Sequence, residues 1–306
     1  MGRYIAKRIV ISLATLFVLV TVVFALVRLM PGDPFSSEKI TPQIRQNLER
    51  YYGFDKPILQ QYVIYIGQLA KGDLGYSMKY ANATVNDIIA KAFPYSADLG
   101  LRALAIAVSV GLTLGIVSAL NRKKPIDAVC VVVAMIGTSI PDFIMGYVLQ
   151  YFFGIRWGLL PIAQYKGFAY TVLPSIGLGF YTLALVSRLM RSSMLEVVQQ
   201  DYIKTAMAKG ASRFRIVWKH MIRNAILPIV TILGPITASV LTGTFVIESI
   251  FAIPGMGKFY VTSVQSLDYT LVLGMTVFFG AFLVSANFIV DILYGIIDPR
   301  IRVSRR

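Results

Sequence analysis

The chain has 306 residues, of which 56% are hydrophobic and 15% are charged, whereas soluble domains average about 25% charged residues. Its mean hydropathy of +0.67 reflects more apolar surface than a soluble core can hide. This excludes a soluble domain, a disordered tail and a secreted disulfide scaffold. The net charge of +15 requires no nucleic-acid partner, because basic loops on one side of a bilayer produce the same excess. The composition therefore predicts an all-α integral membrane protein.

Six long apolar runs predict six transmembrane helices, because a helix needs about 20 apolar residues to cross a bilayer. The first run follows Arg3, Lys7 and Arg8, as the core of a signal peptide would. It is longer than such a core, and no small-residue cleavage site follows it, so we expect it to be retained. The predicted spans cover about residues 9–29, 99–120, 128–154, 167–187, 224–247 and 269–290, within one transmembrane domain of residues 1–306.

The distribution of basic residues predicts the orientation in the membrane. Of the 30 Lys and Arg residues, 18 fall on the side that holds both termini and residues 188–224, and 10 fall on the other side. Cytoplasmic segments carry the excess of Lys and Arg in membrane proteins. We therefore expect both termini and residues 188–224 in the cytoplasm, and the long connection of residues 30–96 outside.

The outer loop of residues 30–96 is rich in aromatic residues, with Pro and Gly at intervals. Aromatic side chains favour the membrane–water interface, so we expect this loop to fold back onto the membrane domain as short helices. Whether it is only a structural cap or also contacts a ligand stays open at this point.

The inner loop of residues 188–224 predicts two short helices that meet at a corner. Its apolar residues recur at helical spacing and alternate with basic ones. Gly210 interrupts the pattern and suits a helix C-terminus with a left-handed backbone, and Ser212 can cap the next helix. A basic amphipathic segment can lie on anionic lipid or dock into a protein groove, and the spacing alone does not decide between these two roles.

The residues of this loop resemble the EAA loop of ABC-transporter permeases, which docks the membrane subunit onto a cytoplasmic ATPase. The resemblance rests on the segments 201–210 and 224–228, where Lys204-Thr205-Ala206 stand in place of Glu-Ala-Ala. The missing Glu and the long gap to Pro228 are similar to the peptide-transporter branch of that family. The resemblance implies that the coupling residues are Asp201, Lys204, Thr205, Ala206, Lys209, Gly210 and Arg213.

Further segments resemble the same branch, and the resemblance extends from about residue 3 to residue 302. They are Met30-Pro31-Gly32-Asp33-Pro34, Gly53 with Pro57, Gly72-Asp73-Leu74-Gly75-Tyr76-Ser77, Ser139-Ile140-Pro141-Asp142-Phe143, Glu248-Ser249-Ile250-Phe251, Pro254-Gly255-Met256-Gly257 and Asp298-Pro299-Arg300.

The resemblance implies a permease subunit of an oligopeptide or dipeptide importer, with the type I ABC importer architecture. It implies a bacterial or archaeal plasma membrane as the location and alternating access as the mechanism. The implied partners are a paralogous permease, two cytoplasmic ATPase subunits that bind ATP and Mg, and an extracytoplasmic peptide-binding protein.

Four residues at membrane depth are candidates for the translocation pathway or its gates. Ionisable groups inside a bilayer are costly and are often functional, which selects Asp142 and Glu248. Pro141 and Pro235 free backbone groups and let their helices bend. A structural role, as a kink or a cap, is the alternative for each of them.

The chain shows no sign of catalysis of its own. It contains no Gly-x-x-x-x-Gly-Lys-Ser/Thr sequence, so a P-loop for ATP is absent. One cysteine, Cys130, and one histidine, His220, predict no catalytic site, no metal site and no cofactor on this chain. Two alternatives remain: an importer of nickel or of a metal chelate, which uses the same permease family, and an ATP-independent carrier.

Overall fold

The computed structural model describes the chain except for residues 1, 30–52, 54, 81–82 and 298–306. The segments Met30–Pro34 and Asp298–Arg300 therefore lie outside the described residues. In the described part, the one β pairing is an isolated bridge between Tyr76 and Thr84. The helices are α1 (Gly2–Arg28), α3 (Ile58–Leu69), α4 (Val85–Leu120), α5 (Pro125–Ser139), α6 (Asp142–Leu149), η1 (Gln150–Arg156), α7 (Phe168–Val197), α8 (Asp201–Ala208), α9 (Arg213–Arg215), η2 (Ile216–Ile222), α10 (Arg223–Ala225), α11 (Leu227–Leu241), α12 (Phe245–Ile250), α13 (Met256–Gln265) and α14 (Tyr269–Ile297).

The predicted all-α membrane fold is confirmed, with one modification. Five helical segments are long and apolar enough to cross a membrane, and they lie in α1, α4, α7, α11 with α12, and α14. The sixth predicted span, residues 128–154, is broken: α5 and the α6–η1 helix meet at an angle of 110°. The six expected spans are present when this bent pair counts as one span.

Four helices, α1, α4, α7 and α14, are longer than the predicted spans because they continue past the apolar runs, and α4 and α7 extend furthest. α4 begins at Val85, inside the expected outer loop, where the Thr84 side chain accepts a hydrogen bond from the Asp87 amide (3.0 Å) and caps the helix. α7 continues to Val197, inside the expected inner loop. Charged residues limit the apolar run that crosses the bilayer, but the helix itself can continue through them. α3 confirms that the outer loop contains a short helix.

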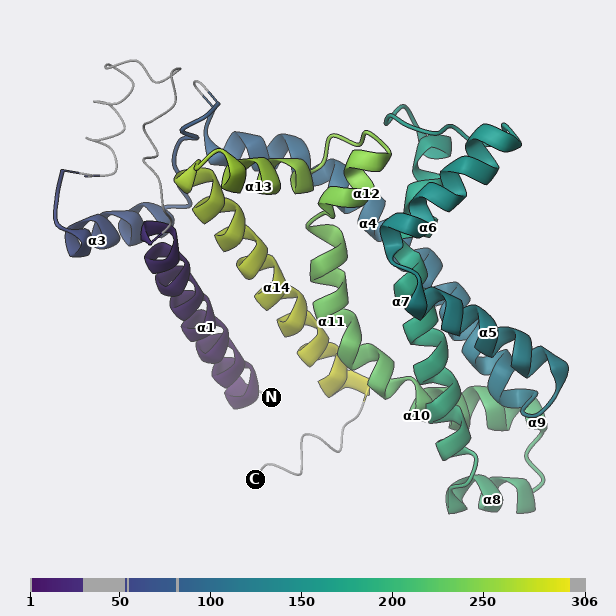
Figure 1. Cartoon of the computed structure of the whole chain (residues 1–306). Coiled ribbons are helices and arrows are strands. Elements are labelled where there is room, and N and C mark those ends of the chain that lie inside the picture. Colours follow the sequence, from purple (N-terminus) through teal and green to yellow (C-terminus); the bar gives the residue numbers. More distant parts are fainter. Residues whose placement is uncertain (1, 30–52, 54, 81–82, 298–306) are drawn as a thin grey trace.

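The helices have two distinct ends (Figure 1). The N-terminal end of α1, the C-terminal end of α14 and helices α8 to α10 lie at one end, and α3, α12 and α13 lie at the other. We call these the inner and outer ends, following the predicted orientation. The common end agrees with the expectation that both termini share a side with residues 188–224.

Helix α7 forms the centre of the fold and packs closely along α4. A Cβ atom added at Gly111 would lie 2.7 Å from the Leu183 carbonyl oxygen, and one at Gly115 would lie 2.6 Å from the Ser187 carbonyl oxygen. The two glycines therefore let the two backbones approach each other, as small residues do in membrane helix pairs.

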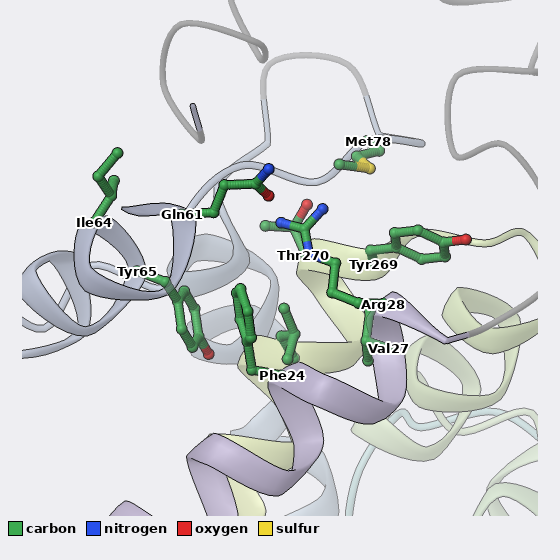
Figure 2. A pocket seen from close by; sticks show the side chains of 10 residues that line it. Phe24, Val27, Arg28, Gln61, Ile64, Tyr65, Met78, Tyr269 and Thr270 are labelled. Carbon is green, nitrogen blue, oxygen red and sulfur yellow. The ribbon is translucent and has the colours of Figure 1, made fainter. Parts of the chain in front are cut away.

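At the outer end, α1, α3 and α14 enclose a small pocket (Figure 2). The Phe24 ring of α1 stacks on Tyr65 of α3 with 5.7 Å between centroids, and the Arg28 side chain reaches in from the end of α1. The pocket volume is only about 20 Å³, which is room for about one water molecule. It is therefore no site for a substrate of peptide size.

A buried carboxylate fastens the outer loop to the start of α14. Asp268 is 1% exposed and accepts hydrogen bonds from the amides of Met78 and Lys79 (3.1 Å each). It also accepts one from the Leu271 amide in the first turn of α14 (3.1 Å) and one from the Ser77 hydroxyl. Ser77, the last residue of the Gly72–Ser77 segment, therefore has a structural role as a partner of Asp268.

We expect Asp268→Asn to loosen this attachment, because an amide nitrogen in place of one oxygen cannot accept from the loop amides. The expected loss is about 2 kcal/mol in the free energy of unfolding. The measurement is the thermal unfolding midpoint in detergent, together with protease cleavage between residues 70 and 80. Asp142→Asn is the control, since that carboxylate is only half-buried and accepts its hydrogen bond from the neighbouring Phe143 amide. Equal midpoints for the two variants would contradict this role.

Candidate coupling corner and polar groove

The inner loop forms the predicted corner at Gly210. This residue has φ +74°, a left-handed conformation that suits glycine. The Gly210 amide donates to the Met207 carbonyl (2.9 Å), and the Ala211 amide donates to the Ala206 carbonyl (3.1 Å). These two bonds form a Schellman motif, which ends α8 by pairing its last carbonyl groups. The prediction of a positive φ at Gly210 is confirmed.

The next helix begins where the sequence predicted. The Ser212 side chain accepts a hydrogen bond from the Arg215 amide and caps the short helix α9. The chain then runs through η2 and α10 into α11, the predicted fifth span. The inner loop is thus one rigid corner between α8 and a second helical segment, and that segment is continuous with a spanning helix.

Helix α8 is attached by a single fully buried side chain and exposes most of the others. Ile203 is 0% exposed and packs against Met190 and Met194 of α7, and Ile216 and Met221 of η2 belong to the same apolar cluster. Six of the seven predicted coupling residues are exposed, namely Asp201, Lys204, Thr205, Lys209, Gly210 and Arg213, and Ala206 is half-buried. Lys204 pairs with Asp201 (2.9 Å) at the surface, where such a pair contributes little to stability.

An ion pair that the sequence analysis missed joins three helices near this corner. Arg191 of α7 donates to both oxygens of Asp127 of α5, at 2.8 and 3.0 Å. Asp127 also accepts from the Ser118 hydroxyl of α4 (2.6 Å) and from the Lys123 amide (3.1 Å). Arg191 was only counted for the orientation and Asp127 was not singled out, and no spacing rule links residues so far apart in sequence.

The break in the third span opens a groove of about 410 Å³ at membrane depth. Three walls surround it: the junction of α5 with α6, the middle of α7, and α11. Two of the four pathway candidates, Pro141 and Asp142, line the groove, and Pro235 does not line it but directly precedes the lining residue Ile236. The groove is lined by Thr138, Ser139, Ile140, Pro141, Asp142, Leu178, Tyr181, Thr182, Ile236, Ser239, Val240 and Thr244.

Asp142 is the one lining residue of this groove that carries a formal charge at neutral pH. Its side chain is half-buried, and one of its oxygens accepts a hydrogen bond from the Phe143 amide (2.8 Å) in the first turn of α6. Pro141 stands at the N-cap position of that helix, with φ −55° and ψ 143°, so it ends the α5 direction and starts the α6 direction. Pro141 and Asp142 thus both lie at the break between α5 and α6.

Glu248, the fourth candidate, lies apart from the groove and is 1% exposed. Its carboxylate accepts from the Ser96 hydroxyl of α4 (2.6 Å) and from the Gly257 amide of α13 (2.8 Å). A Cβ atom at Gly255 would lie 2.4 Å from this carboxylate. Glu248 therefore braces the outer end of the fold, which is the structural role that the sequence left open.

The sequence analysis named Ser139 only as part of a family segment and missed the other hydroxyl side chains that line the groove, namely Thr138, Tyr181, Thr182, Ser239 and Thr244. Hydroxyl groups inside apolar runs were the only available signal. This signal is weak, because Ser and Thr in a spanning helix often bond their own backbone, as Thr138 does to the Ala134 carbonyl (3.1 Å). Among the residues that the structure describes, no cluster of His, Cys, Asp and Glu could hold a metal ion.

Sequence comparison identifies the family of this chain. The family model of the binding-protein-dependent transport system inner membrane component matches residues 111–303, and the model of the N-terminal part of such components matches residues 1–100. The chain is 43% identical to the dipeptide transport system permease protein DppB of Bacillus subtilis, with 100% of both chains covered. It is 44% identical to the oligopeptide transport system permease protein OppB of Haemophilus influenzae, with 99% of this chain and 100% of that protein covered.

Two solved transporters share the fold at low sequence identity. An amino acid ABC transporter crystallised with histidines superposes with a TM-score of 0.54 at 15% identity, covering 68% of this chain and 94% of the other. The methionine ABC transporter MetNI in an inward-facing conformation also gives 0.54 at 15% identity, covering 69% and 96%. With the helices described above, these comparisons place the chain in the family of binding-protein-dependent transport system inner membrane components, multi-pass proteins of the bacterial inner membrane.

Proposed function

We propose that this chain is the membrane-spanning subunit of an ATP-driven importer of dipeptides or oligopeptides. The observation that carries the proposal is the full-length likeness to curated relatives named for dipeptide and oligopeptide transport, at 43% and 44% identity. Because the alignments span 100% and 99% of this chain, they include both the groove residues and the inner loop.

The chain supplies a pathway and a mechanical link, and other subunits supply the energy and the ligand. It has no P-loop sequence, so ATP and Mg bind to two cytoplasmic ATPase subunits. A second, paralogous permease completes the pathway, and an extracytoplasmic binding protein delivers the peptide. The chain itself carries no catalytic, metal or cofactor site under this proposal.

The fold links the inner corner to the groove through two helices. α7 ends four residues before α8 begins, and its middle part carries Leu178 and Thr182 in one wall of the groove. On the other side of the corner, η2 and α10 lead into α11, which carries Ser239 in the opposite wall. A displacement of the corner by the ATPase pair therefore moves both walls, and this is how we propose that ATP closure and hydrolysis alternate the access of the groove.

The groove is the proposed path of the peptide. Its hydroxyl groups and the Asp142 carboxylate can replace water around a polar backbone, and its volume of about 410 Å³ falls in the usual range for small-ligand sites. Because Ile236 and Val240 also line it, the groove offers apolar as well as polar contacts, which suits peptides with varied side chains.

The proposed orientation predicts which positions a membrane-impermeant reagent reaches from outside. In a Cys130→Ala background, which removes the single native cysteine, Gln60→Cys on α3 should be labelled and Arg213→Cys at the corner should not. Both positions are exposed in the structure, so burial does not explain a difference. The measurement uses intact spheroplasts, with lysed ones as the positive control. Labelling of position 213 alone would reverse the topology.

The groove predicts a sharp contrast between two neighbouring positions on α11. Ser239 is exposed and lines the groove, whereas Ala238 is 0% exposed. In the same cysteine-free background, Ser239→Cys in the assembled complex should react with a charged thiol reagent, because thiolate chemistry needs water. Ala238→Cys is the matched control and should stay unmodified. Equal reaction at both positions, or none at 239, would show that no wet path runs here.

Gly210→Val should uncouple transport from ATP hydrolysis. A β-branched residue with positive φ is strained by about 1–2 kcal/mol. A Cβ atom added at Gly210 meets no atom of the described residues within 4 Å, so the valine side chain would point at the docked ATPase. We expect a correctly inserted subunit, weaker ATPase co-purification and loss of ATP-dependent peptide uptake into proteoliposomes that contain the complete complex.

Two variants isolate the cause. Gly210→Asn tolerates the left-handed backbone and should retain more uptake than the valine variant. Gly72→Val introduces the same kind of strain at φ +77°, also with nothing within 4 Å, but at the outer end, and should leave ATPase binding unchanged. Wild-type uptake by Gly210→Val would refute the coupling role, and absence of ATP-dependent peptide uptake by the wild-type complex would refute the proposed function.

A further inference from the structure

The second helical segment of the inner loop, residues 213–225, has one face that the fold buries and one that it leaves open. Ile216, Val217 and Met221 are between 5% and 9% exposed and pack against the inner end of α7. On the opposite face, Phe214 and Trp218 are 73% and 59% exposed. Their rings lie one helical turn apart with 5.9 Å between centroids. Two large aromatic side chains thus form one continuous exposed patch.

Basic residues surround this aromatic patch without acidic ones. Arg213, Arg215, Lys219 and Arg223 are all exposed, and residues 213–225 contain no Asp or Glu. Within the described part of the chain, none of these four residues takes part in an ion pair. The open face therefore combines exposed aromatic rings with uncompensated positive charge.

The position of the segment relative to the spanning helices fixes its depth. Its buried face packs on Met190 and Met194 of α7, just beyond the apolar run of that span, which ends at Ser187. The segment then continues through α10 into α11, so it cannot lie far from the membrane. Figure 1 shows α9 and α10 running across the inner end of α7, with α8 farther out. We therefore expect the segment to lie level with the lipid headgroups.

We propose that the Phe214–Trp218 face rests on the headgroups of anionic phospholipids and holds the base of the coupling corner at the membrane surface. Aromatic rings favour the headgroup level, and the four basic residues complement the negative charge of an anionic lipid surface. The two possible roles of the inner loop then belong to different helices: α8 docks to protein, and residues 213–225 contact lipid. This assignment is independent of what the transporter carries.

The fluorescence of Trp218 tests the proposal directly. The chain has two tryptophans, Trp157 and Trp218, so Trp157→Phe leaves Trp218 as the single reporter. The full chain is reconstituted into phosphatidylcholine vesicles that contain the same fraction of either brominated phosphatidylglycerol or brominated phosphatidylcholine. We expect quenching by both lipids, stronger with phosphatidylglycerol, and a preference that weakens in high salt because screening shortens the range of the charges.

Two matched double variants separate this face from general charge. Arg215→Gln with Lys219→Gln should lower the preference for phosphatidylglycerol several-fold, because one Lys or Arg near an anionic surface changes lipid binding by about fivefold. Lys204→Gln with Lys209→Gln removes the same charge from α8 and the corner and should leave the preference unchanged. Equal quenching by the two lipids, an equal loss in both double variants, or no quenching because protein or water covers the face would each overturn the proposal.

Discussion

The bilayer offers no hydrogen bonds to a broken helix, and this constraint decides where the polar groove can lie. α5 and α6 meet at 110°, and the break at Pro141 interrupts the ladder of backbone hydrogen bonds. Irregular backbone is stable at membrane depth only where protein covers it or where it lines a wet cavity. Here the break faces α7 and α11, whose hydroxyl groups at Thr182 and Ser239 line the same groove. The groove thus provides the polar surroundings that the broken backbone needs, and the break in turn opens the groove.

Burial separates the structural carboxylates from the one that can meet a substrate. Asp127, Glu248 and Asp268 are between 1% and 6% exposed, and each accepts hydrogen bonds from at least two different segments of the chain. They hold helix ends and loops in place, as buried charges do when their partners satisfy them. Asp142 differs because its side chain is only half-buried, lines the groove and accepts a hydrogen bond from the neighbouring Phe143 amide. A charged residue near a membrane is thus a functional candidate only after its partners are known.

Sequence alone predicted the features that depend on local chemistry. Apolar runs located the six spans, and the interruption at Gly210 located the corner, since positive φ is a local property of the backbone. The start of α4 at Val85 was not predicted, and Pro141 indicated that the third span could bend but not that the angle would be 110°. The bend depends on tertiary packing: a Cβ atom at Gly177 of α7 would lie 3.3 Å from the Cα atom of Gly146 in α6, and no periodicity encodes such a contact between distant residues.

The connection between corner and groove has a thermodynamic consequence under the proposed function. Two of the three walls of the groove belong to helices that flank the inner loop, α7 and α11, so a displacement of the corner also displaces the groove. Linkage is reciprocal for binding free energies: if ATPase closure on α8 changes the affinity of the groove for peptide by some factor, peptide in the groove changes the affinity of α8 for the closed ATPase by the same factor. Two features carry that coupling: the buried side chain of Ile203, and the helical segment of residues 213–225 that continues into α11. Contact between this segment and lipid would hold the loop in place, so that a movement of α8 reaches the groove.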